Sequence, residues 1–167
     1  MLRAMTSGLI FSVVLFGCAT PQKEYSPKEW REAMKDGKSS LWGPLITIEA
    51  FDAPRPYAQI AETLRKKSKE CLDLTVHSSG MVKHGMYWVR ENSRTDYKPI
   101  LTTEKGKTEL TVHGNKNPLY GLDVVPAGRN ASRVTVYRAK MGVSNTIHSA
   151  VQGWVKGDSV TCPRWNG

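Results

Sequence analysis

The sequence of 167 residues lacks an apolar run long enough to cross a lipid bilayer. Its N-terminal apolar run, from Gly8 to Gly17, has only about half of the roughly 20 residues that a helix needs to cross the hydrocarbon core. The only charge before this run is Arg3, and small residues follow it before Pro21. A positive start, a short apolar segment and a small-residue exit are typical of a secretory signal peptide. The segment is therefore expected to direct export and then to be removed.

Catalytic motifs are missing as well. The GKS of residues 37–39 and the GKT of residues 106–108 are similar to the end of a phosphate-binding loop, which needs another glycine further upstream. Glu32 and Leu101 stand where that glycine would be. The sequence contains no G-x-S-x-G, S-x-x-K or H-E-x-x-H motif. From Leu45 onward, 11 acidic residues are scattered among 18 basic ones, which does not indicate paired catalytic carboxylates. We therefore expect no enzymatic activity.

Ligands for a metal ion are sparse. The chain has three cysteines, without a C-x-x-C pair or a cysteine–histidine cluster. The tetrapeptide LTVH occurs twice and ends at His77 and at His113. In a strand, Leu and Val would face the core and each histidine the other side, so we expect both histidines to face solvent or a cleft. No carboxylate or cysteine recurs nearby at ligand spacing, and the sequence predicts neither a metal nor a cofactor.

Residues Leu15 to Cys18, with the sequence LFGC, resemble the lipobox of bacterial lipoproteins. In that family the cysteine receives a diacylglycerol, the signal peptide is cut just before it, and the new amino terminus is acylated. Phe16 departs from the pattern, because a smaller residue is usual there. The resemblance implies that residues 1–17 are a lipoprotein signal peptide and that palmitate-type chains anchor Cys18 in a membrane. Ala19, where some family members carry an Asp that retains them in the inner membrane, implies the periplasmic face of the outer membrane. A buried N-terminal strand or helix that ends in cysteine is the alternative.

The remaining cysteines, Cys71 and Cys162, allow one intramolecular pairing. In an exported chain two such cysteines usually form a disulfide. The bond would close a loop of about 90 residues and contribute roughly 4–5 kcal/mol by the chain-entropy estimate. Two free thiols or a metal site are the alternatives.

Positive charge exceeds negative charge, with a formal net charge of +9. Removing residues 1–17 deletes one arginine and no acid, which leaves 150 residues and a net charge of +8. A basic protein held at a membrane faces anionic lipid head groups, lipopolysaccharide phosphates or acidic cell-wall polymers. Export makes nucleic acid an unexpected partner. A solvated surface without a partner is the alternative.

The chain after the signal peptide divides into a tether and a domain. Residues 18–44 are expected to be a polar, lipidated tether with one short helix, in which Ser26 and Glu29 form a capping box and Gly37 ends the helix. We expect this helix to pack on an edge of the domain, with the membrane surface as the alternative. Residues 45–167 are expected to form a single domain, because their number suits one core.

Two helices and a series of strands are predicted within that domain. Apolar residues recur every three or four positions from Tyr57 to Leu72 and from Ser144 to Lys156. Strand-like segments lie between turn signals such as Ser79-Gly80. The predicted strands are residues 45–51, 74–78, 86–92, 98–103, 109–113, 119–125 and 133–138. Because the connections are short and contain no helix, the sequence predicts an α+β fold with an antiparallel meander sheet of about six or seven strands and two helices on one face.

The order of these elements loosely resembles the helix-grip domains of envelope lipoproteins and of lipid-binding START-like proteins. The resemblance covers Leu45 to Cys162 and includes no motif. It implies the same general architecture and transfers no functional residue.

Two functions are compatible with these features. The first is a membrane-anchored, non-catalytic interaction or structural accessory module that contacts an envelope protein or an anionic envelope surface. The alternative is a carrier of a lipid or other apolar ligand in a cleft between helix and sheet. A large apolar cavity would favour the carrier. A filled core with an exposed apolar patch would favour the interaction module. The ligand-binding residues of such a carrier are not predicted.

Overall fold

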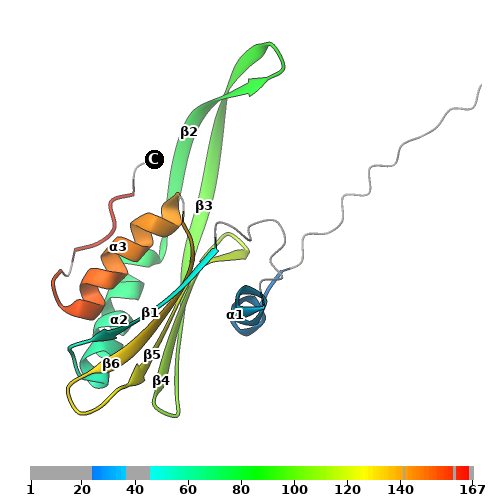
Figure 1. Ribbon diagram of the computed structural model, residues 1–167. Coiled ribbons are helices and arrows are strands. Elements are labelled where there is room, and N and C mark those ends of the chain that lie inside the picture. Colours follow the sequence, from blue (N-terminus) through cyan, green and yellow to red (C-terminus); the bar gives the residue numbers. More distant parts are fainter. Residues whose placement is uncertain (1–23, 37–45, 141, 160, 166–167) are drawn as a thin grey trace, which may run out of the picture.

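The computed structural model describes residues 24–36, 46–140, 142–159 and 161–165 (Figure 1). The predicted lipobox with Cys18 and about half of the predicted tether lie outside these residues. Within the described part, no helix is long and apolar enough to span a membrane.

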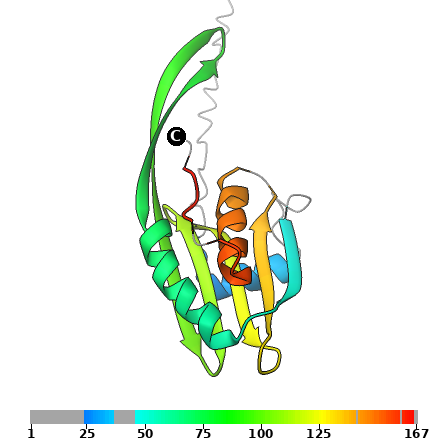
Figure 2. The ribbon, with the colours of Figure 1, turned by 90° about the vertical axis from the view of Figure 1, so that its left-hand side faces the viewer.

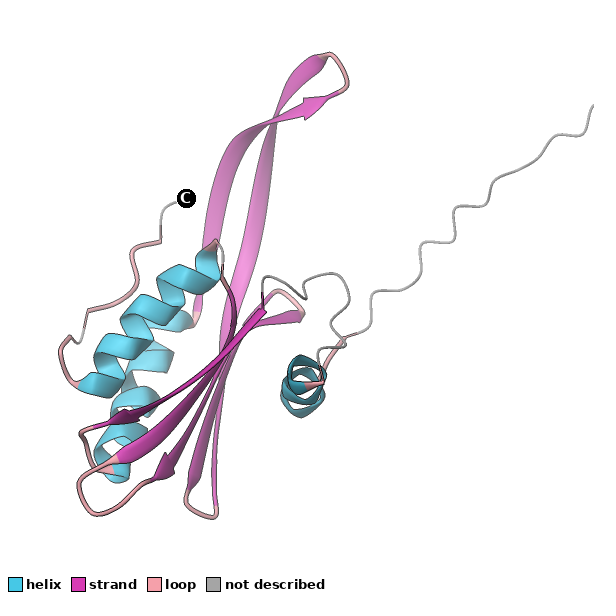
Figure 3. Ribbon diagram, viewed as in Figure 1, coloured by secondary structure: helices cyan, strands magenta, loops and turns pink. Residues whose placement is uncertain are grey.

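The described residues form one antiparallel sheet of six strands (Figure 3). Neighbouring strands in chain order pair with each other from β2 to β6, and β1 adds to the outer edge of β6. The predicted α+β class with an antiparallel sheet is confirmed. The strands are β1 (Ile46–Ala53), β2 (Leu74–His84), β3 (Tyr87–Glu104), β4 (Lys107–Gly114), β5 (Asn117–Pro126) and β6 (Ser132–Ala139).

The predictions for β2 and β3 were wrong in their bounds. The turn predicted at Ser79-Gly80 lies inside β2. The predicted strands 86–92 and 98–103 are both parts of the single strand β3, except for Met86, which lies in the turn. The chain turns instead at Gly85, whose φ of +60° suits glycine. Pro99 is tolerated within β3 because at that position β3 pairs with β4 alone, since the pairing with β2 ends at Tyr97.

Two helices, α2 (Tyr57–Leu72) and α3 (Val143–Lys156), cover one face of the sheet (Figure 2). Their apolar stripes follow the predicted spacing and meet the alternating apolar residues of β4, β5 and β6. The core is filled by large side chains that are fully buried. They include Trp154, Tyr120, Ile60, Leu64, Leu72, Leu110, Leu122 and Ile147.

A third helix, α1 (Pro27–Lys35), lies on the opposite face of the sheet (Figure 1). The described part of the fold therefore has three helices, because the short helix predicted in the tether packs on the face of the sheet and not at an edge of the domain. The predicted capping box is present, with the Ser26 hydroxyl accepting from the amide of Glu29 at 3.3 Å. The Trp30 ring lies over Gly121, where an added Cβ would approach it to 2.7 Å. Glycine at this position thus permits the close approach of α1.

Candidate functional site

A two-stranded hairpin projects from the end of the sheet (Figure 1). We define the arm as residues 77–94, in which β2 and β3 pair only with each other, from His77 opposite Arg94 to His84 opposite Tyr87. The pairing of β3 with β4 begins at Tyr97. At about 3.3 Å per residue, the arm itself is roughly 25 Å long.

The base of the arm is fixed by hydrogen bonds between its two strands and by others to the turn between β4 and β5. The Thr75 hydroxyl donates to the carboxylate of Asp96 at 2.6 Å, and Arg94 donates to the same carboxylate at 3.2 Å. These bonds hold the pKa of Asp96 below its usual value. The turn between β4 and β5 contributes Asn115, whose side-chain oxygen accepts from the Asp96 amide at 2.9 Å and whose own amide donates to the Asp96 carbonyl at 2.8 Å. The arm is therefore firmly joined to the sheet.

The lower part of the arm is polar on both faces. Ser78 and Ser93 share a hydrogen bond of 2.6 Å across one face, and Arg90 donates to Ser79 at 3.3 Å on the other. No residue of this part is buried. It therefore has no apolar face that could pack against the rest of the domain.

The upper part, residues 81–89, carries large apolar side chains on both faces, together with Lys83 and His84, and we call it the arm tip. Because cross-strand partners share a face, Val82 and Val89 lie on one side, while Met81 and Trp88 lie on the other. The turn adds Met86. The exposed fractions are 88% for Met86, 74% for Tyr87 and 63% for Trp88. Side chains of this size and exposure mark a contact surface.

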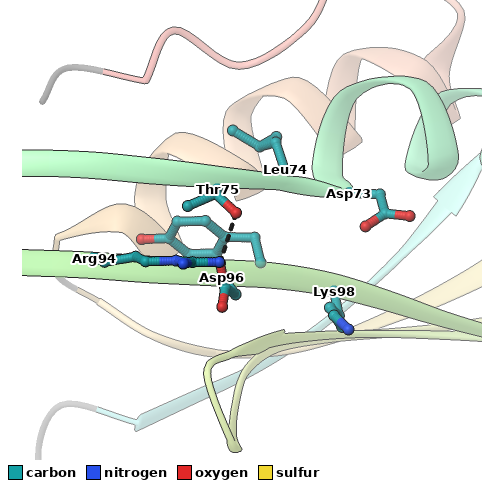
Figure 4. Close-up of a pocket in the computed structure, with 7 residues that line it drawn as sticks. Asp73, Leu74, Thr75, Arg94, Asp96 and Lys98 are labelled. Carbon is teal, nitrogen blue, oxygen red and sulfur yellow. Dashed lines mark hydrogen bonds and ion pairs between the residues drawn. The ribbon is translucent and has the colours of Figure 1, made fainter.

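Two shallow hollows lie at the base of the arm. The first, of about 330 Å³, runs along the β2 edge and has Asp73, Arg94, Asp96 and Lys98 in its wall (Figure 4). The second, of about 320 Å³, lies between the arm, the start of α3 and Trp165. Both are at the lower limit of ligand pockets, and the first is lined mainly by charged and polar groups. Among the described residues, these hollows favour the interaction module over the carrier.

A buried polar cluster joins α1 to the sheet. The Arg31 side chain is 5% exposed and donates to Asp123 at 2.8 Å, to the Thr111 hydroxyl at 2.7 Å and to the Leu110 carbonyl at 3.0 Å. Lys107 contacts the second oxygen of Asp123 at 2.9 Å. Despite its partial burial, Lys107 has a raised pKa, because Glu109 and Asp123 accept hydrogen bonds from it.

The same cluster explains the environment of two other titratable groups. Burial, together with the neighbouring Asp123 carboxylate, raises the pKa of Tyr137 to about 12. Burial and the charge of Arg31 lower the pKa of His113, whose Nδ1 is buried without a hydrogen-bond partner. His113 is thus buried on the α1 side of the sheet, although it was expected to face solvent or a cleft. His77 lies on the arm and is exposed, as expected. The structure does not bring the two histidines together.

The structure brings the predicted cysteine pair together. Cys71, at the end of α2, is joined to Cys162 with Cα atoms 5.1 Å apart. Among the described residues, Glu70 and these two cysteines are the group whose ligating atoms could surround a metal ion. Two of the three atoms are the sulfurs of the disulfide, so this group offers no metal site while the bond is intact.

Comparisons with known proteins give little further information. No protein-family model and no curated protein matches the chain. The solved structure of TTHA0849 from Thermus thermophilus matches with 15% identity and a TM-score of 0.24, over 68% of this chain and 88% of that one. A likeness at this level carries no argument about fold or function.

Neither the arm nor the Arg31–Asp123 pair was predicted from the sequence. One signal for the arm was the adjacent Tyr87 and Trp88, which cannot both face a core from a regular strand. A second was the polar stretch from Glu91 to Asp96, which offers no apolar face on either side. Two strands of this kind, joined at Gly85, indicate a hairpin that stands free of the core.

Proposed function

We propose that this protein is a lipid-anchored, non-catalytic interaction module of the bacterial envelope and that the arm is its contact element. The observation that carries the proposal is the pairing of a filled core with an exposed apolar arm tip. Natural proteins shield or shorten free strand edges, so a long hairpin with large exposed side chains indicates a function in recognition.

The anchor is tested by metabolic labelling. The resemblance of residues 15–18 to a lipobox supports acylation of Cys18, which would hold the domain at the membrane through several acyl chains. Cells that express the full chain are expected to incorporate labelled palmitate into it, and the Cys18→Ala variant is expected to incorporate none. Equal labelling of both chains, or of neither, would contradict the anchor.

The contact is tested by photo-crosslinking in intact cells. A photoreactive amino acid at Val89, in the arm tip, is expected to form adducts with envelope components. The matched control is Ala58, which is also exposed but lies on α2, away from the arm. Adducts at position 58 but not at position 89 would show that the arm is not the contact element.

A further inference from the structure

The arm changes in character along its length. From His77 to Gly80 and from Glu91 to Arg94, both strands carry polar or small side chains. Beyond them, the arm tip carries apolar side chains on both faces. A groove on a folded protein usually covers one face of a strand pair and leaves the other in water. An end with apolar side chains on both faces suits an environment that contacts both faces at once, such as the interfacial region of a bilayer.

The identity of the tip residues agrees with that medium. Trp88 and Tyr87 have amphipathic rings of the kind that gather at the level of lipid head groups. Lys83 lies opposite Trp88, and Arg90 lies opposite Met81, so two cations flank the apolar side chains. Their long stems can lie along apolar surface while the charges reach phosphates. The one carboxylate nearby, Glu91, is hydrogen-bonded to His84 at 2.6 Å. The charge of the tip therefore suits an anionic surface.

The short length of chain between Cys18 and the described residues also agrees. Glu24, the first described residue, forms an ion pair of 2.8 Å with Lys116, in the turn that also fixes the base of the arm. Five residues lie between Cys18 and Glu24, and even fully extended this stretch spans only about 20 Å. From the same level, the ten residues from Asp96 to Tyr87 span roughly 30 Å. A membrane that holds Cys18 is consequently within reach of the arm tip.

We propose that the arm tip inserts shallowly into the anionic bilayer surface that holds the lipidated Cys18. This inference rests on the proposed function and names the surface that the arm contacts. Insertion stops at the head-group region, because the outer edges of β2 and β3 in the arm have backbone groups that no further strand satisfies, and such edges are excluded from hydrocarbon. The domain would then have two membrane contacts, which fix its orientation at the surface.

The test uses the unlipidated chain of residues 19–167, so that the anchor does not contribute. Every contact described for this fold lies within residues 24–165, and this chain retains all of them. It is mixed with vesicles of phosphatidylcholine and phosphatidylglycerol, and its partition is measured by co-sedimentation. We expect binding to these vesicles at low salt, weaker binding at high salt, and little binding to pure phosphatidylcholine.

Two double variants distinguish membrane binding by the arm tip from nonspecific binding through other exposed apolar side chains. Met86→Ser with Trp88→Ser is expected to lower the partition coefficient at least about tenfold, because both large side chains leave the interface. Ile48→Ser with Ile100→Ser is the matched control, since these residues are 42% and 43% exposed but lie on the body of the sheet. The control is expected to bind like the unaltered chain.

The outcomes are distinct. Absence of vesicle binding, or equal loss in the two double variants, would overturn the inference. If Val89 captures a protein in cells and the vesicles bind nothing, the arm contacts a protein and the inference also fails, although the proposed function stands. The vesicle assay uses a chain without the lipid anchor. A negative palmitate result would therefore contradict the anchor, and the vesicle assay would still decide whether the arm tip binds a membrane.

Discussion

Removing the disulfide between Cys71 and Cys162 is expected to lower the melting temperature by roughly 10 °C. The bond spans 91 residues of sequence, so the reduced, unfolded chain gains the entropy of a long loop. A loop of this length corresponds to about 4–5 kcal/mol in the chain-entropy estimate. For a domain of this size, each kcal/mol shifts the melting temperature by roughly 2–4 °C.

The native contacts near the bond add to this effect. The segment 161–165 lies over the edge of the core, where Trp165 stacks on Tyr97 with ring centroids 4.7 Å apart. The indole N–H of Trp154 donates to the Thr161 carbonyl at 2.8 Å. The disulfide ties this segment to the end of α2. Its loss is therefore expected to weaken the packing of Trp165 on Tyr97, in addition to its effect on the entropy of the unfolded chain.

The measurement is thermal unfolding followed by circular dichroism, with and without a thiol reductant. The matched control is the double variant Cys71→Ala with Cys162→Ala, which should melt at the lower temperature in both conditions. Reductant should then lower the melting temperature of the unaltered chain and leave that of the double variant unchanged. If reductant does not move the melting temperature of the unaltered chain, the bond contributes nothing to its stability.

The parts of the fold that follow a repeating pattern could be predicted from the sequence. The bounds of α2 agree with the prediction, because apolar residues from Tyr57 to Leu72 recur at helical spacing. The strands β4 to β6 also agree within a few residues, since their alternation reflects one buried face. In both cases a core lies next to the element and imposes the pattern.

The arm and the docking of α1 could not be predicted in the same way. Residues 77–80 and 91–94 face solvent on both sides, so no alternation distinguishes them from a loop. The pair that fixes α1, Arg31 and Asp123, is separated by 92 residues. A single charged pair produces no periodic pattern in the sequence. Nothing in the sequence distinguishes these two buried charged residues from exposed ones. The arm was therefore not predicted, because it does not pack against the core and its sequence carries no pattern of burial.

Replacing Asp123 with alanine is expected to detach α1 from the sheet while the rest of the fold persists. Arg31 would remain as a buried guanidinium with neutral acceptors only, the hydroxyl of Thr111 and two backbone carbonyls. Removing one partner of a buried ion pair typically costs about 3–5 kcal/mol. Outside its cluster with Arg31, α1 contacts the described part of the sheet chiefly through Trp30 and Met34. Undocking, which returns Arg31 to water, is therefore the expected response in place of global unfolding.

Hydrogen exchange of the α1 amides measures this detachment directly. Exchange is expected to accelerate on the order of 100-fold in Asp123→Ala, whereas amides of β4 and β5 keep most of their protection. The matched control is Asp52→Ala, which breaks the exposed Arg133–Asp52 pair and should leave α1 unchanged. Unchanged exchange in Asp123→Ala, or the same acceleration in both variants, would contradict the role of the buried pair.

Arg31→Met completes the test, because the two partners of the pair are not equivalent. Without Arg31, Asp123 still has Lys107 at 2.9 Å and the Tyr137 hydroxyl at 3.3 Å, and a methionine side chain keeps much of the packing volume. This variant should therefore accelerate α1 exchange less than Asp123→Ala does. That order would show that the cost lies in the uncompensated guanidinium and not in the loss of contact between helix and sheet.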